Sequence, residues 1–160
     1  MDKRYYEEKI KNATPMGLVI ITYEMLLETL EKASKEIETN SETAREAIIH
    51  AQAILRSLTS GLNLDYDIST ELLDIYMYIS SILIDCQIKA NRANSEGFVK
   101  ENIAHVSELL NSLLEGIKAV PDTDAPIIET SSKIHAGMTY GKDGNLSEYI
   151  HEDISKTYKA

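Results

Sequence analysis

Pairs of glutamate and histidine are the first side chains in this sequence that could do chemistry, because together they bind metals in helical bundles. A carboxylate-bridged metal bundle needs Glu-x-x-His on two helices and inward-facing glutamates on the other two. Glu46 and His50, like Glu101 and His105, are separated by four positions rather than three. The required spacing occurs at residues 148–151, in a stretch of weak helical periodicity. We therefore interpret these histidines as ordinary surface residues and expect no metal and no cofactor.

The other motif-like stretches also fail on spacing. Residues 143–147 begin like a calcium-binding loop, but Glu148 replaces the glycine of its sixth position and Ile154 the glutamate of its twelfth. Residues 137–142 lack both the glycine spacing of a phosphate-binding loop and a preceding strand. No Ser-His-Asp or Cys-His set has support from the sequence. We therefore expect a binding protein and not an enzyme.

Length and charge narrow the class of protein further. A chain of 160 residues with 43% apolar side chains can form one hydrophobic core without metals or disulfides. The 16 Lys and Arg against 26 Asp and Glu give a net charge of −10, which disfavours nucleic acid and anionic membranes as partners. The sequence has no membrane-spanning stretch and no signal-peptide pattern, and Cys86 has no cysteine to pair with. These features predict a cytoplasmic protein without membrane insertion.

The strongest helix signal lies at Thr14 and Pro15. A threonine can cap a helix, and proline suits the first helical position because its missing N–H is not needed there. Over residues 15–38, apolar side chains recur at steps of three and four and form one core-facing stripe: Val19, Tyr23, Leu26, Leu30, Ala33 and Ile37. A second, shorter stripe that this core does not explain consists of Leu18, Ile21 and Met25.

Three more helices follow the same stepping, over about residues 42–63, 70–92 and 96–119. Ser69 is the expected N-cap of the helix over 70–92. Apolar residues cover so many sides of that helix that we place it at the centre of the bundle, buried on most sides.

These elements predict an all-α protein. Four long helices with short polar links favour an antiparallel four-helix bundle within residues 1–120, preceded by an N-terminal segment. Pro121 prevents the last helix from continuing. Residues 121–160 then form a C-terminal tail or peripheral wrap, with one short helix near residues 147–157.

The chain has more apolar surface than its core requires, and the sequence leaves two interpretations open. The surplus can form a groove for an amphipathic helix of a partner, a common mode of recognition. Alternatively, the tail covers the surplus with its own apolar side chains, Ile127, Ile128, Ile134 and Ile150.

Three stretches, taken in order, carry a family resemblance. The first is Tyr5-Tyr6 before Thr14-Pro15 and the run from Leu18 to Glu24; the second is residues 51–58 with Gly61-Leu62-Asn63; the third is residues 71–79 with Ala90-Asn91. In order, spacing and helix boundaries, residues 5–120 resemble the flagellar export chaperones of the FliS type. The chain departs from the family pattern at Thr22, where Leu is usual, and at Ile117, where many members have Trp.

The resemblance implies a chaperone that binds the disordered C-terminal segment of flagellin. Binding would prevent premature polymerisation and keep flagellin competent for flagellar type III secretion. The client-binding residues implied are Leu18, Ile21, Met25, Ile48, Leu55, Tyr76 and Ile79, with Tyr5, Tyr6 and Ile10 folding back over the groove when no client is bound. Core packing is the stronger interpretation for the four that lie on regular stripes, Ile48, Leu55, Tyr76 and Ile79.

Two other classes of function remain open. A generic helical adaptor or self-assembling bundle without a flagellin client would dimerise through the face of Leu18, Ile21 and Met25. A catalytic or metal-binding bundle is the third class. For the chaperone, the flagellar export gate is a second candidate partner, and we expect a monomer or a weak dimer when no client is bound.

Overall fold

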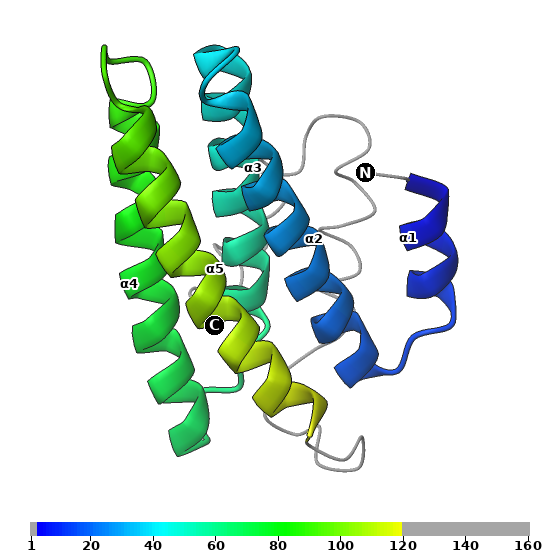
Figure 1. Ribbon diagram of the computed structural model, residues 1–160. Helices are drawn as coiled ribbons and strands as arrows, with labels where there is room; N and C mark the ends of the chain where they lie inside the picture. Colours follow the sequence, from blue (N-terminus) through cyan, green and yellow to red (C-terminus); the bar gives the residue numbers. More distant parts are fainter. Residues whose placement is uncertain (1–2, 120–160) are drawn as a thin grey trace.

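The computed structural model describes residues 3–119, and all of its regular elements there are helices (Figure 1). The five helices are α1 (Lys3–Lys11), α2 (Pro15–Glu36), α3 (Ser41–Ser60), α4 (Asp67–Lys89) and α5 (Glu96–Lys118). The prediction of an all-α protein is confirmed. The four predicted helices correspond to α2–α5, whereas α1 lies in the N-terminal segment, for which no helix was predicted.

The four longer helices form a closed ring of neighbours. α2 packs against α3 and α5, and α4 packs against the same two helices from the other side. In Figure 1 the chain reverses direction at each link from α2 to α5, and α1 lies outside the ring against α2. The core therefore fills the space inside the ring, and α1 is an addition to its outer surface.

The beginnings of α2 and α3 are fixed by local hydrogen bonds. Thr14 accepts a hydrogen bond from the Gly17 amide at 3.0 Å, and Pro15 follows it as the first helical residue. A Cβ atom at position 17 would lie 3.2 Å from the Thr14 Oγ1, so glycine fits this cap best. Asn40 caps α3 in the same way, accepting from the Thr43 amide at 3.1 Å. The predicted threonine cap is confirmed.

The prediction of Ser69 as an N-cap is wrong. α4 begins three residues earlier than predicted, at Asp67, after Tyr66 in an extended conformation, and Ser69 is fully buried inside the first turn. The amide of Ser69 donates to the Tyr66 carbonyl at 3.0 Å, which joins it to the helix. At α5, Ser95 precedes the helix as predicted, but its hydroxyl donates to the Ala90 carbonyl at 3.4 Å and not to the new helix.

The position predicted for α4 is also wrong. It lies at one edge of the bundle, and α2 has more neighbours, since α1, α3 and α5 all pack against it (Figure 1). Only one face of α4 is buried, along Leu72, Tyr76, Ile79, Leu83 and Cys86. The apolar content of the helix exceeds what two neighbours can cover.

The core consists mainly of aliphatic side chains and contains a buried pair of tyrosines. The hydroxyls of Tyr23 and Tyr76 lie 2.5 Å apart and link α2 to α4 across the ring. Both side chains are almost completely buried, so each hydroxyl satisfies the other away from water.

Near one end of the bundle, Lys100 of α5 forms an ion pair of 2.6 Å with Glu38, just after α2.

Two further observations concern the predictions of membrane and tail. None of the helices within residues 3–119 combines the length and the apolar content that a membrane span requires. The predicted tail over 121–160, its short helix near 147–157, the Glu-x-x-His spacing at 148–151 and the loop-like stretches between 137 and 147 lie outside the described residues.

Candidate functional site

Helix α1 covers part of the outer face of α2. Tyr6 is buried and belongs to the main core cluster of the protein, and Ile10 packs against that cluster. The Tyr6 hydroxyl donates to the Glu28 Oε2 at 2.6 Å, a short bond to a charged acceptor. Burial, and then the neighbouring carboxylate of Glu28, raise the pKa of Tyr6, so the hydroxyl remains protonated and available as a donor.

Lys9 makes the second polar contact between α1 and α2. Its ammonium group lies 3.5 Å from the Glu24 Oε2 and 4.4 Å from the centre of the Tyr5 ring. The rings of Tyr5 and Tyr6 meet edge to face, with centroids 5.2 Å apart. Tyr5 is half exposed, whereas Tyr6, Lys9 and Ile10 all contribute to the attachment of α1.

The surplus stripe of α2 is buried. Leu18, Ile21 and Met25 are each less than one-tenth exposed. Ile21 and Met25 share the apolar cluster with Tyr6, whereas Leu18 is buried outside that cluster. Because Ile21 and Met25 lie at helical steps of three from Glu24 and Glu28, they are on the face of α2 that Tyr6 and Lys9 contact.

The remaining predicted residues lie inside the ring. Ile48, Leu55, Tyr76 and Ile79 are at most 2% exposed and are part of the main core cluster. Core packing, the stronger interpretation of these four from the sequence, describes their position in this structure.

An exposed apolar surface lies on α4, on a different face from Tyr76 and Ile79, the two residues of this helix that were predicted to bind a client. Of the large apolar side chains that are exposed within residues 3–119, only Tyr5 lies outside the segment 64–88; the others are Leu64, Tyr66, Ile68, Met77, Tyr78, Ile84 and Ile88. Met77, Ile84 and Ile88 are spaced by seven and four positions, which places them on one face of the helix. We call these three residues the α4 stripe.

A signal for the α4 stripe was present in the sequence. The apolar residues of this helix occur on more sides than a bundle neighbour can cover. Central burial of this helix was one prediction from that excess, and a surplus that a partner or the tail covers was another; the structure shows the α4 stripe exposed at the edge of the bundle.

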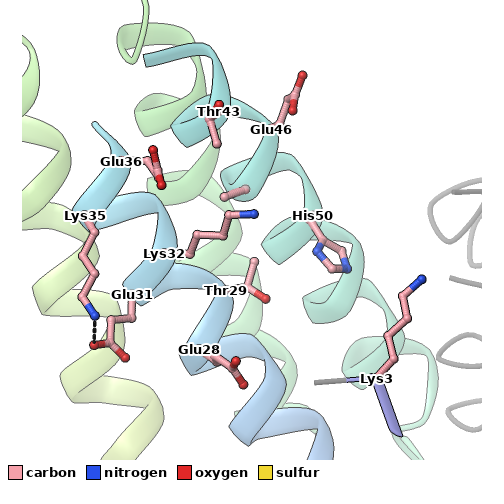
Figure 2. A pocket seen from close by; sticks show the side chains of 11 residues that line it. Lys3, Glu28, Thr29, Glu31, Lys32, Lys35, Glu36, Thr43, Glu46 and His50 are labelled. Atoms are coloured by element: carbon pink, nitrogen blue, oxygen red, sulfur yellow. Dashed lines mark ion pairs between the residues drawn. The ribbon is translucent and has the colours of Figure 1, made fainter. Parts of the chain in front are cut away.

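Beside α1, a polar cleft of about 620 Å³ lies at the surface between α2 and α3 (Figure 2). Lys3 at the start of α1 reaches its rim, and Lys32 extends from α2 toward α3, where Glu46 and His50 line the opposite wall. Burial, and then the positive charge of Lys32, lower the pKa of His50. The neutral imidazole is therefore favoured, and the lining carries charges of both signs without a nucleophile paired to a base.

No arrangement in the described part of the chain suggests metal binding or covalent chemistry. Residues 3–119 contain no group of three or more His, Cys, Asp or Glu side chains that could hold a metal ion. Burial raises the pKa of the Cys86 thiol to about 11, so it is a poor nucleophile in the folded protein.

The comparison with known proteins decides the family. Residues 1–121 match the family described as flagellar protein FliS. The chain belongs to the FliS family. Over 116 residues it is 26% identical to the flagellar secretion chaperone FliS of Bacillus subtilis (strain 168), an alignment that covers 72% of this chain and 84% of that protein.

The FliS match confirms the resemblance drawn from the sequence. It extends from the first residue to just past α5, so α1 lies within the matched region as fully as the ring of four helices. The part of the chain after residue 121 lies beyond the family match.

Proposed function

We propose that this FliS-family protein is a flagellar secretion chaperone whose client is the C-terminal segment of flagellin. By covering that segment, it prevents premature polymerisation and keeps flagellin competent for type III export. Membership of the FliS family and similarity to a relative named a flagellar secretion chaperone support this function. The export gate is the second candidate partner, and the protein acts in the cytoplasm as a monomer or a weak dimer.

The observation that carries the proposal is the concentration of exposed apolar side chains on one segment. Single exposed apolar residues scattered over a surface need no explanation, but a contiguous group indicates a surface that another molecule covers. Met77 is 62% exposed and Ile88 54% exposed, on the same face of one helix. The net charge of −10 helps to keep a protein with such a surface in solution.

A second client surface lies beneath α1. Ile21 and Met25 lie at helical steps of three from Glu24 and Glu28, so they share the face of α2 that Tyr6 and Lys9 of α1 contact. α1 and α4 lie on opposite sides of the ring (Figure 1). A client in contact with both surfaces must therefore be a chain segment long enough to wrap around the bundle.

A disordered client suits this geometry. Ordering such a segment costs conformational entropy, and burial of apolar side chains along two surfaces offsets that cost. Ile48, Leu55, Tyr76 and Ile79 are interior and would reach a client only if the helices separated. The proposal therefore rests on the α4 stripe and on the α2 face beneath α1.

Calorimetric titration of the full chain with the C-terminal segment of a flagellin from the same organism tests the proposal. We expect one-to-one binding with a strongly negative heat-capacity change, the sign of buried apolar area. Met77→Asp should weaken binding at least tenfold, because it places a charge in the α4 stripe. Met77 is exposed, so a charge at this position tests binding alone. Met25 is buried, and a charge at that position would also disturb folding.

Ala104→Asp is the matched control, because it adds the same charge at an exposed position of α5 outside the α4 stripe. Equal affinities of the wild type and Met77→Asp would refute the role of the stripe. No binding of the segment, together with a stable dimer that Met77→Asp dissociates, would favour a self-assembling helical adaptor.

A further inference from the structure

The face of α2 that α1 covers has a polar edge as well as an apolar one. Glu24 and Glu28 lie one helical turn apart on α2, and both are half-buried. Tyr6 donates to Glu28 at 2.6 Å, and Lys9 pairs with Glu24 at 3.5 Å. α1 thus presents a hydroxyl and an ammonium group, three positions apart, to two carboxylates.

The direction of the two helices explains this pairing. α1 and α2 run in opposite directions in Figure 1, so the earlier residue of α1 meets the later residue of α2. Tyr6 and Ile10, four positions apart, form the apolar side of the same helix, and both pack with the main core cluster, to which Ile21 and Met25 also belong. One short helix thereby satisfies the apolar and the acidic parts of this surface together.

A wholly apolar helix would fit this surface poorly. It would cover the carboxylates of Glu24 and Glu28 and replace neither donor that α1 supplies. Covering a charged group without giving it a hydrogen-bond partner is unfavourable, because the group loses water. The cleft of about 620 Å³ continues the polar edge beyond the start of α1, with Lys32 and Glu46 in its lining (Figure 2).

We propose that the client helix that replaces α1 donates to the same two carboxylates. The helix carries a hydroxyl or amide donor for Glu28 and a lysine or arginine for Glu24, about one turn apart beside an apolar face. Glu24 and Glu28 then select client helices by the hydrogen-bond donors along one side of the helix, and Tyr6 and Lys9 of α1 provide donors of the same kind. This inference rests on the proposed chaperone function and adds the class of segment that the α2 face accepts.

The test separates the client from α1 by using full-length variants. Tyr6→Phe/Lys9→Gln removes the donors of α1 and leaves the carboxylates of α2 in place. Glu24→Gln/Glu28→Gln, added to that pair, removes the negative charges while conserving shape. Both proteins are titrated with the flagellin C-terminal segment, and circular dichroism compares their helix content.

We expect the fourfold variant to bind the segment at least tenfold more weakly than Tyr6→Phe/Lys9→Gln, and the difference to shrink at high salt because it is ionic. Equal or tighter binding by the fourfold variant would overturn the inference, since the client would then make no use of the carboxylates. Failure of both the wild type and Tyr6→Phe/Lys9→Gln to bind would overturn the chaperone function, and this inference with it.

Discussion

Replacing Tyr6 with phenylalanine should loosen α1 from α2. The substitution keeps the buried ring and removes only the hydroxyl that donates to Glu28 at 2.6 Å. A hydrogen bond to a charged group contributes about 1.5–3 kcal/mol. Because Glu28 is half-buried, water can replace part of this bond, and we expect a loss of about 1–2 kcal/mol. Since 1.4 kcal/mol corresponds to a factor of ten, the ratio of docked to undocked α1 should fall about 5- to 30-fold.

Amide hydrogen exchange measures this change directly. A helix of nine residues is too short to be stable alone in water, so undocking exposes the amides of α1. Protection within residues 3–11 should fall by the same factor, while α2–α5 keep theirs. If α1 competes with the client, the Kd of the client should fall by no more than that factor.

Tyr5→Phe is the control, because Tyr5 belongs to the same helix but is 51% exposed. Unchanged protection of residues 3–11 in Tyr6→Phe would refute the reasoning, since the bond to Glu28 would then not hold α1. Loss of protection throughout α2–α5 would also refute it, because the hydroxyl would then stabilise the whole bundle.

Three further predictions concern the core and the cleft. Tyr23→Phe and Tyr76→Phe should each lower the free energy of unfolding by about 1–3 kcal/mol, because each leaves one buried hydroxyl without its partner. The double variant should lose clearly less than the sum of the two, and urea unfolding of the wild type and the three variants measures this. Burial raises the pKa of Cys86 to about 11, so a thiol reagent at pH 8 should react slowly with the native protein and rapidly with the protein unfolded in urea. Rapid labelling of the native protein would contradict the burial of this thiol. Burial and Lys32 lower the pKa of His50 in the folded protein, so below its usual 6.5 the unfolded chain takes up the proton first. The free energy of unfolding should therefore fall as pH falls, and His50→Gln should reduce this dependence in urea unfolding at a series of pH values.

The sequence predicted those parts of the fold whose causes are local. The cap of α2 joins Thr14 to an amide three positions later, and the apolar stripes repeat within one turn, so both are visible in a short window. α1 was not predicted because nine residues give little periodicity. Its docking depends on Tyr6 and Glu28, which are 22 positions apart.

The candidate site divides in the same way. Tyr6, Ile10, Ile21 and Met25 were named from the sequence, and the structure places α1 against the face of α2 that carries Ile21 and Met25. The α4 stripe was missed, since Met77 and its neighbours look as apolar as core residues and were assigned to the core.

The sequence by itself determined that the chain forms long helices, where most of them begin and end, which side chains are apolar, and which family the chain resembles. Only the tertiary structure decided which apolar stripes are covered: α1 lies over α2, and α4 lies at the edge with Met77 exposed. The physical reason is that a helix needs only hydrogen bonds between residues four positions apart, whereas burial of its faces depends on neighbours that are distant in the chain.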